Sequence, residues 1–282
     1  MKKFYYFVFV LVMSACSVTT EESTTSSSGT SDGTASAPVE LTVGTAKTGG
    51  VAYFGDSYYK FTTSSTGAGS YKLAIDSMVI TQGSSTYAVT TYLFSNSGLT
   101  TSSRLDSESC AASCTLYFDY QNLDSSKTYY LHLSAWGTIT YSLTVSQGGS
   151  EGSKNNPVEL TLSTAHTGGK VEGYYYFTGY NRGNSYYKFT TTSADNYTLS
   201  MNNSDSLDCY LYSDSTFSSS SLVSNTNNGC TAGTNLSTTF KGSSGTGLSA
   251  TTAYYLMIEQ QGSTASAAKT TTYDNMTVAP EG

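Results

Sequence analysis

Cysteine is the residue type in this 282-residue chain with the widest chemical repertoire. After Cys16, four cysteines form two pairs along the sequence, Cys110 with Cys114 and Cys209 with Cys230. A redox centre would need a Cys-x-x-Cys spacing in an electropositive setting, and a zinc site would need histidines at matching spacing, and the sequence has neither. An even number of cysteines favours disulfides in an exported protein, and the N-terminus indicates export. We therefore predict the disulfides Cys110–Cys114 and Cys209–Cys230.

The sequence contains no convincing motif for hydrolysis or for nucleotide binding. Neither H-E-x-x-H nor a phosphate-binding glycine loop occurs. Residues 29–33 (GTSDG) match the G-x-S-x-G nucleophile pattern, but that pattern works only at a sharp strand-to-helix turn. In a segment this rich in Ser and Gly, a chance match is expected. We predict no catalytic residue and a non-enzymatic protein, with an unrecognised secreted hydrolase as the least favoured alternative.

The N-terminus has the layout of a signal peptide. Two lysines precede an apolar stretch at residues 4–13, which is too short to span a bilayer as a helix. The following Met-Ser-Ala-Cys resembles the bacterial lipobox, in which the chain is cut before a cysteine that then receives acyl chains. We expect residues 1–15 to be removed and Cys16 to be lipidated, giving an effectively permanent membrane anchor. Ser17, in place of Asp, resembles the signal for outer-membrane sorting in enteric bacteria, whereas display on the surface or in the periplasm stays open.

Composition predicts a tether after the anchor and excludes one class of partner. Residues 16–37 are almost all Ser, Thr, Gly and Glu, so we predict a disordered tether that reaches on the order of 25 Å as a coil. Without Lys2 and Lys3, 11 basic residues face 20 acidic ones, a net charge near −9. This charge argues against nucleic acid as a partner and against electrostatic adhesion to anionic lipid.

The rest of the chain is a duplication. The heptapeptide SYYKFTT occurs at residues 57–63 and again at 185–191, and PVELTVGTAKTGG at 38–50 matches PVELTLSTAHTGG at 157–169. Later segments repeat in the same order, including TYLFS at 91–95 with CYLYS at 209–213. We predict a first domain at residues 38–146, a linker at 147–156 and a second domain at 157–279, each large enough for its own core.

Both copies show the period-two alternation of β-strands. Tyr71, Leu73 and Ile75 alternate with polar or small residues, and Tyr59 and Phe61 share one face of the heptapeptide. Gly-, Ser- and Asn-rich turns separate these short segments, and no helical period is sustained. The sequence therefore predicts an all-β protein with two tandem antiparallel β-sandwich domains of jelly-roll type.

The order of these segments resembles the bacterial pre-peptidase C-terminal domain family. The resemblance covers about nine-tenths of the chain after the tether and includes SLDCYLYSD at residues 206–214, which is similar to the Asp-containing central strand of that family. The first copy lacks this acid. The resemblance implies a β-sandwich of a secreted or surface protein, whose relatives assist secretion or substrate attachment, and some of which bind calcium, polysaccharide or collagen-like fibres.

Calcium is the one cofactor that the resemblance suggests. Oxygen ligands could come from Asp205, Asp208 and Asp214, or from Glu40 and Asp56 with loop carbonyls. The sequence has no EF-hand or Asp-rich nonapeptide spacing, and isolated surface carboxylates are usually solvated. The favoured prediction is therefore no metal site.

The second copy contains an aromatic insertion. From Pro38 to Ser57 there are 19 positions and from Pro157 to Ser185 there are 28, so the second copy has nine extra residues. Aromatic rings with polar tips and a guanidinium are enriched at binding hot spots, and flat rings stack on sugars. The candidate ligand-binding residues are Tyr174, Tyr175, Tyr176, Phe177, Tyr180 and Arg182. The favoured alternative is a longer hairpin whose rings pack on the neighbouring sheet or on the other domain.

The two histidines can be tested against the duplication. His132 corresponds to Met257 and His166 to Lys47, so neither is retained in the sister copy. We predict that both are solvated surface residues. The sequence as a whole predicts a lipid-anchored, non-catalytic binding or adhesion module for a glycan or protein, and the alternative is a structural or accessory envelope lipoprotein.

Overall fold

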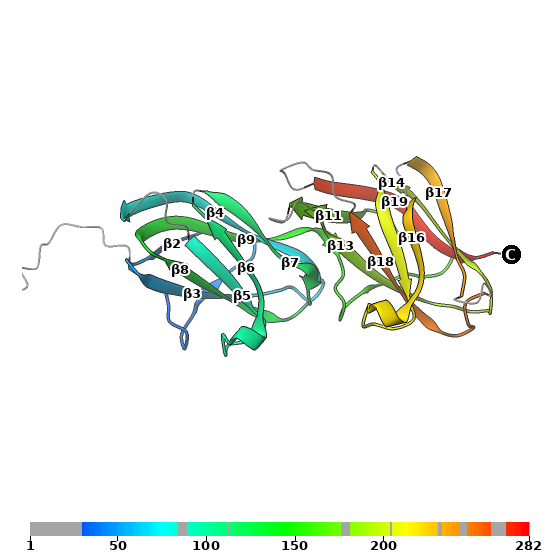
Figure 1. The fold of residues 1–282 in the computed structure, drawn as a ribbon, viewed down its shortest axis with the longest axis horizontal. Helices are drawn as coiled ribbons and strands as arrows, with labels where there is room; N and C mark the ends of the chain where they lie inside the picture. Colours follow the sequence, from blue (N-terminus) through cyan, green and yellow to red (C-terminus); the bar gives the residue numbers. More distant parts are fainter. Residues whose placement is uncertain are drawn as a thin grey trace, which may run out of the picture.

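The protein is all-β and forms two domains placed end to end (Figure 1). The computed structural model describes residues 30–83, 89–111, 113–175, 181–203, 205–230, 233–242, 247–260 and 269–281. Within these residues, no helix is long and apolar enough to cross a membrane. Cys16 and residues 1–29 lie outside the described ranges.

Each domain consists of two sheets that face each other across a core. In the first domain, one sheet has the order β1-β3-β8-β5-β6, with β1 (Val39–Leu41), β3 (Gly55–Thr62), β8 (Thr128–Ala135), β5 (Val89–Phe94) and β6 (Arg104–Cys110). The other has the order β2-β9-β4-β7, with β2 (Lys47–Val51), β9 (Thr138–Glu151), β4 (Gly69–Gln82) and β7 (Cys114–Leu123). A short 3-10 helix, η1 (Thr101–Ser103), precedes β6.

The second domain repeats this arrangement. One sheet has the order β10-β13-β18-β15-β16, with β10 (Val158–Glu159), β13 (Asn184–Thr190), β18 (Ala253–Gln260), β15 (Leu207–Tyr212) and β16 (Leu222–Cys230). The other has the order β12-β11-β19-β14-β17, with β12 (Asn181–Arg182), β11 (Gly169–Tyr175), β19 (Lys269–Pro280), β14 (Tyr197–Asn203) and β17 (Gly233–Phe240). The helix η2 (Ser219–Ser221) occupies the place of η1.

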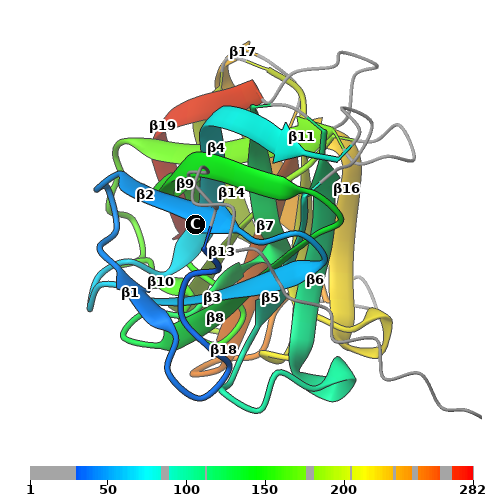
Figure 2. The same ribbon diagram turned by 90° about the vertical axis from the view of Figure 1, so that its left-hand side faces the viewer.

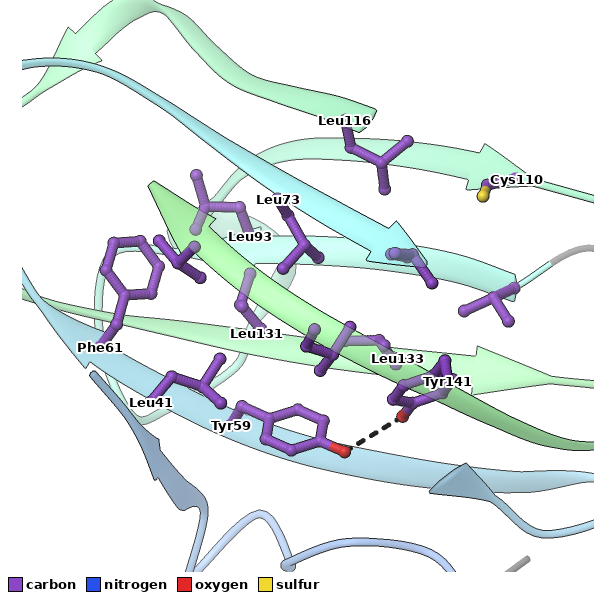
Figure 3. Close-up of a cluster of buried hydrophobic side chains, with 14 of the residues drawn as sticks. Leu41, Tyr59, Phe61, Leu73, Leu93, Cys110, Leu116, Leu131, Leu133 and Tyr141 are labelled. Atoms are coloured by element: carbon purple, nitrogen blue, oxygen red, sulfur yellow. Dashed lines mark hydrogen bonds between the residues drawn. The ribbon is translucent and has the colours of Figure 1, made fainter. Parts of the chain in front are cut away.

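The apolar residues that alternate along the sequence are the residues whose side chains are buried in the strands. Tyr59 and Phe61 of β3 and Leu131 and Leu133 of β8 are fully buried and meet in the core of the first domain (Figure 3). Cys209 of β15 is buried in the second core in the same way. One expectation needs correction, because β1 runs parallel to β3, and β10 to β13. The chain crosses to the opposite sheet as β2 or β11 between these strands and returns in its original direction.

An acidic contact fixes the residues before β1 to the first domain. Asp32 Oδ2 accepts a hydrogen bond from Tyr59 Oη at 2.7 Å and from the Gly50 N–H at 3.1 Å. Tyr59 Oη in turn lies 3.1 Å from Tyr141 Oη, in the hydrogen bond drawn in Figure 3. Both phenol hydroxyls are buried, and each has an acceptor, because Tyr59 donates to the Asp32 carboxylate and Tyr141 donates to the Gly50 carbonyl at 3.2 Å. We call Asp32, Tyr59 and Tyr141 the first clasp.

The predicted boundary of the tether is therefore wrong for residues 30–37. The Tyr58 N–H donates to the Asp32 carbonyl at 2.8 Å, and Thr34 and Ala37 exchange two backbone hydrogen bonds that close a turn. Low hydrophobicity predicted disorder, but here hydrogen bonds to the folded domain hold the segment. The first domain thus begins before Pro38.

The second domain has its own clasp at the matching place. Glu151 Oε2 accepts a hydrogen bond from Tyr187 Oη at 2.6 Å and lies 3.0 Å from His166 Nε2. Tyr187 Oη is also hydrogen-bonded to Tyr273 Oη. We call Glu151, Tyr187 and Tyr273 the second clasp.

The predicted linker at residues 147–156 needs the same correction. Strand β9 continues to Glu151, and Ser153 and Asn156 close the turn that Thr34 and Ala37 close in the first domain. The repeat therefore starts at Ser31-Asp32-Gly33 in one copy and at Ser150-Glu151-Gly152 in the other.

The domains pack against each other through the base of the aromatic insertion. Glu172 of β11 has a side chain only 5% exposed, and it forms an ion pair with Lys72 of β4 at 3.2 Å. The Gly149 N–H donates to the same carboxylate. On the other side of the junction, Asn122 Nδ2 donates to the Asn184 carbonyl at 2.6 Å. Part of the insertion is thus used to join the two domains.

Both predicted disulfides are present. Cys110 is bonded to Cys114, and Cys209 to Cys230, with sequence separations of 4 and 21. The second bond closes the longer loop and joins two core strands.

We expect the double substitution Cys209→Ala/Cys230→Ala to lower the free energy of unfolding by about 3 kcal/mol, because the disulfide removes loop-closure entropy from the unfolded chain. The measurement is denaturant unfolding under oxidising conditions. The pair Cys110→Ala/Cys114→Ala is the matched control, with an expected loss of about 2 kcal/mol for its short loop. An equal or larger loss from the control pair would contradict this ranking.

Candidate functional site

Three rings form a row on the outer face of the first domain. Tyr58 of β3, His132 of β8 and Tyr92 of β5 are cross-strand neighbours in the strand pairing. The Tyr58 and His132 ring centroids lie 4.8 Å apart, and those of Tyr92 and His132 lie 5.3 Å apart, both pairs stacked. Alternation places these side chains outside because Tyr59, Leu131 and Leu133 point into the core. We call Tyr58, His132 and Tyr92 the ring row.

Charged groups flank the ring row at both ends. Asp56 Oδ1 lies 2.8 Å from His132 Nε2, and the Arg104 guanidinium lies 5.9 Å from the centroid of the Tyr92 ring. Burial, and then the Asp56 carboxylate, raise the pKa of Tyr58 above its ordinary value. Among the described side chains, Arg104 forms no ion pair, which leaves its charge available to a ligand.

An open depression lies beside the ring row. Its volume is about 280 Å³, and it is lined by Tyr92, Phe94, Leu99, Thr101, Arg104, His132 and Ser134. The lining combines apolar surface with hydroxyls, an imidazole and a guanidinium. Such a surface can cover an apolar ring face and donate hydrogen bonds to its polar edge.

The second domain has the same face in a closed form. Tyr186, Met257 and Tyr210 occupy the places of Tyr58, His132 and Tyr92 in the strand register. Phe217, which takes the place of Leu99, lies over this surface with its ring centroid 4.8 Å from that of Tyr186 and 5.3 Å from that of Tyr212.

This covering buries Tyr186, whereas Tyr210 and Met257 stay partly exposed. Tyr186, Tyr212 and Phe217 are buried and form an apolar cluster with Leu222, which takes the place of Arg104. Phe217 and Leu99 both have a positive φ of 49°, so the two loops share a backbone shape and differ in their side chains. The duplicated domains therefore differ at this face, which is open in the first copy and filled from within the chain in the second.

The Asp56–His132 pair invites comparison with a catalytic triad. Ser134 lies two residues after His132 on the same face of β8, which separates their Cα atoms by roughly 7 Å. No hydrogen bond joins Ser134 to His132 in the described part of the chain. A nucleophilic serine needs such a bond to its base, so the geometry offers no activated nucleophile.

Both histidines are partly exposed, and each lies beside an acid. The His132 side chain is 22% exposed and lies between two rings, and that of His166 is 24% exposed and contacts the second clasp. Each lies within hydrogen-bonding distance of a carboxylate, at Asp56 and Glu151 respectively. That they are solvated surface residues with no role in a shared site stays a prediction.

The predicted aromatic site lies only partly within the described residues. Tyr174 and Tyr175 end β11, and their backbone pairs with that of Arg182 and Asn181 in β12, so this segment is a hairpin. Tyr176, Phe177 and Tyr180 lie outside the described ranges. The proposed contacts of these six side chains stay a prediction.

The three candidate calcium ligands are not brought together. Asp205 and Asp208 lie at the start of β15, whereas Asp214 follows its end, so Asp208 and Asp214 are on the order of 20 Å apart along the strand. The Asp214 carboxylate accepts hydrogen bonds from the Thr216 N–H and hydroxyl, which lower its pKa. Across the described residues, no three carboxylate, histidine or cysteine groups gather as a metal site would require.

Sequence reasoning missed the ring row and both clasps. The ring row had a signal, since strand alternation in TYYLHL (residues 128–133) puts His132 on the face opposite Leu131 and Leu133. Tyr58 and Tyr92 likewise occupy outward positions of their own strands. The clasps had a signal too, because an acid followed by glycine precedes each PVEL motif at the same distance.

Comparisons with known proteins identify no family for this chain. No protein-family model and no curated protein matches the chain. A "putative secreted protein" from Eubacterium rectale matches at 9% identity over 89% of this chain and 82% of that chain, with a TM-score of 0.24. The CUB1-EGF-CUB2 domains of rat MASP-1 match at 8% identity over 84% and 99%, with a TM-score of 0.26. The PBSX exported protein XepA matches at 10% identity over 84% and 88%, with a TM-score of 0.24.

Proposed function

We propose that this protein is a lipid-anchored, non-catalytic binding module of the bacterial cell envelope. Cys16 would hold it at the membrane, in an outer-membrane location that faces either the surface or the periplasm. The ligand would be a glycan or an extracellular protein. Export agrees with two intact disulfides, which persist in oxidising compartments.

The observation that carries this proposal is the difference between the two outer faces. A duplicated domain that needed its outer face only for stability could close it in both copies, as Phe217 closes the second. The first copy instead keeps a depression with a row of rings and a guanidinium that forms no ion pair with any side chain the structure describes. Its polar and aromatic lining suits a sugar unit or a polar side chain, with Arg104 favouring ligands that carry a carboxylate.

We expect Tyr92→Ala and Arg104→Ala each to weaken binding at least about tenfold, since one well-placed contact contributes on the order of 1.4 kcal/mol. The measurement is binding to glycan and matrix-protein arrays by the chain from residue 16 with Cys16→Ser, followed by titration of each positive ligand. Tyr210→Ala in the second domain is the matched control, because it removes a ring from the equivalent but closed face.

Two further results would separate the alternatives. If Tyr174→Ala/Tyr175→Ala abolishes binding and Tyr92→Ala does not, the ligand site is the insertion hairpin. If no array gives a signal, the structural or accessory lipoprotein becomes the better interpretation. Hydrolysis of any glycan or peptide that is lost in His132→Ala would overturn the non-enzymatic assignment.

A further inference from the structure

Three exposed aromatic side chains gather at one end of the first domain. Tyr53 and Phe54 form the turn between β2 and β3, and Trp136 forms the turn between β8 and β9. Their exposed fractions are 44%, 65% and 61%, and the ring centroids lie 4.3 Å apart for Tyr53 and Phe54 and 6.1 Å apart for Phe54 and Trp136. We call Tyr53, Phe54 and Trp136 the aromatic tip.

One residue of the aromatic tip, Phe54, has a backbone conformation that phenylalanine rarely adopts. Phe54 has a φ of 52°, in the left-handed region that favours glycine. A bulky ring at such a position, more exposed than buried, gains little from packing. A residue of this kind in a strained turn marks a functional candidate.

The aromatic tip lies at the end of the first domain that faces away from the second. Strands β4 and β9 run the length of the domain, from the junction at Gly69 and Glu151 to the pairing of Gln82 with Thr138 next to Trp136. Figure 2 looks at the molecule from the side of the first domain. No part of the second domain reaches this end.

The chain enters the first domain at this same end. The Ala52 N–H donates to Ser31 Oγ at 3.2 Å, one residue before Tyr53. The residues between Cys16 and this point, 16–29, have a composition that predicts a coil with an end-to-end distance on the order of 20 Å. A lipid on Cys16 would therefore hold the aromatic tip within reach of the bilayer surface.

In the second domain, the equivalent end of the fold is covered by the first domain. The segment that matches the turn at Tyr53 and Phe54 is the base of the insertion, where Glu172 packs on the first domain through Lys72. The same end of the fold thus docks onto a neighbouring body in the second copy. In the first copy it carries rings in place of an ion pair, which suits an interfacial lipid environment better than a protein surface of fixed charges.

We propose that the aromatic tip inserts into the interface of the bilayer that anchors the chain. Trp and Tyr favour the headgroup level, where the ring is buried and its polar atom stays hydrated. The overall negative charge and the neighbouring Asp56 favour zwitterionic over anionic headgroups. This inference rests on the proposed lipid anchor for the identity of the membrane.

Trp136 is the only tryptophan, so its fluorescence reports on the aromatic tip alone. The experiment uses the chain from residue 16 with Cys16→Ser and vesicles of zwitterionic phosphatidylcholine and phosphatidylethanolamine. We expect a blue shift of the emission and quenching by lipids brominated near the headgroup, with little change when the salt concentration is raised.

Two variants and one control decide the result. Phe54→Gly suits the positive φ and removes the side chain with the highest exposed fraction of the three, so it should fold normally and partition at least about tenfold more weakly into vesicles. Tyr53→Ser should act in the same direction. Leu105→Ser removes an exposed apolar side chain at the other end of the domain and should leave partitioning unchanged.

The proposal is overturned if the wild-type chain shows neither a shift nor quenching, or if Phe54→Gly partitions as the wild type does. Binding of a soluble glycan or protein that shifts the emission when vesicles do not would also overturn it. Lipidation itself is tested separately, by mass spectrometry of the N-terminal peptide from membranes. A negative result there would remove the anchor while the vesicle experiment still reports on the aromatic tip.

Discussion

Replacing Asp32 by alanine should lower the free energy of unfolding of the first domain by about 2–3 kcal/mol, although Asp32 lies outside every strand. The substitution removes an ionised acceptor of two hydrogen bonds, from Tyr59 Oη and from the Gly50 N–H. A hydrogen bond to a charged group contributes about 1.5–3 kcal/mol to stability. A donor that is left buried without a partner lowers the stability of the folded state more than a donor that water can reach. The Tyr59 hydroxyl keeps only Tyr141 as a partner.

Denaturant unfolding of Asp32→Ala beside Asp76→Ala tests this expectation. Asp76 is exposed on the same domain and forms no hydrogen bond or ion pair among the described residues, so its loss should change stability by less than about 0.5 kcal/mol. Glu151→Ala should have an effect like that of Asp32→Ala, confined to the second domain, because it removes the partner of Tyr187 and His166. Equal stability of Asp32→Ala and Asp76→Ala would show that the first clasp does not hold the fold.

Raising the pH above about 10 should destabilise both domains steeply. Burial raises the pKa of Tyr141 to about 12, and burial together with the neighbouring tyrosine raises the pKa values of Tyr59 and Tyr187 well above their ordinary value. The unfolded chain ionises at the ordinary tyrosine pKa of 10.0, below the folded value. The protonated phenols therefore contribute stability that is fully present below pH 10 and is lost as the pH rises through the folded pKa values.

The size of the stability loss at high pH follows from the shift in the tyrosine pKa values. At about 1.4 kcal/mol for each pKa unit, Tyr141 alone accounts for a loss of about 1.4 kcal/mol at about pH 11, and of about 3 kcal/mol once its folded pKa is passed. The measurement is the free energy of unfolding at about pH 8 and about pH 11, with tyrosinate followed by ultraviolet absorbance. Tyr141→Phe should reduce the alkaline loss, and Tyr53→Phe, at an exposed ring, should not. A chain as stable at the higher pH as at the lower would contradict the burial of these hydroxyls.

Much of the fold could be predicted from the sequence because its determinants are local or repeated. The alternation of Tyr71, Leu73 and Ile75 fixes which face of β4 is buried, and the repeated heptapeptide shows that the architecture is used twice. The disulfide between Cys209 and Cys230 followed from the inward register of Leu207 and Leu211. These predictions needed only the period of a strand and the cysteine count.

The clasps could not be predicted from composition. The contact between Asp32 and Tyr59 joins residues 27 positions apart, and its acidic member lies in a segment whose few apolar groups indicated disorder. Hydrophobic patterning detects residues that fold by burying apolar surface. It does not detect a segment that is held because a buried hydroxyl needs an acceptor.

The candidate site shows the same limit. The outward positions of Tyr58, Tyr92 and His132 were readable from alternation, whereas the closure of the second domain depends on where Phe217 lies in space. That ring reaches Tyr186, more than thirty residues earlier in the chain, from a loop whose course no periodicity describes. The insertion drew attention by its aromatic residues, but the part of it that the structure describes in detail is Glu172, a charged residue at the domain junction.

Strand β9 is a single element that lies between β2 and β4 in the first domain and ends on Glu151, whose carboxylate belongs to the second clasp. No linker segment therefore separates the two domains. Such a protein should behave as one rigid rod, so the second domain is held at a fixed distance and orientation from the first. Tension applied to the far end would pass along the backbone of β9 into both domains together, so the pair should resist a pull as one unit.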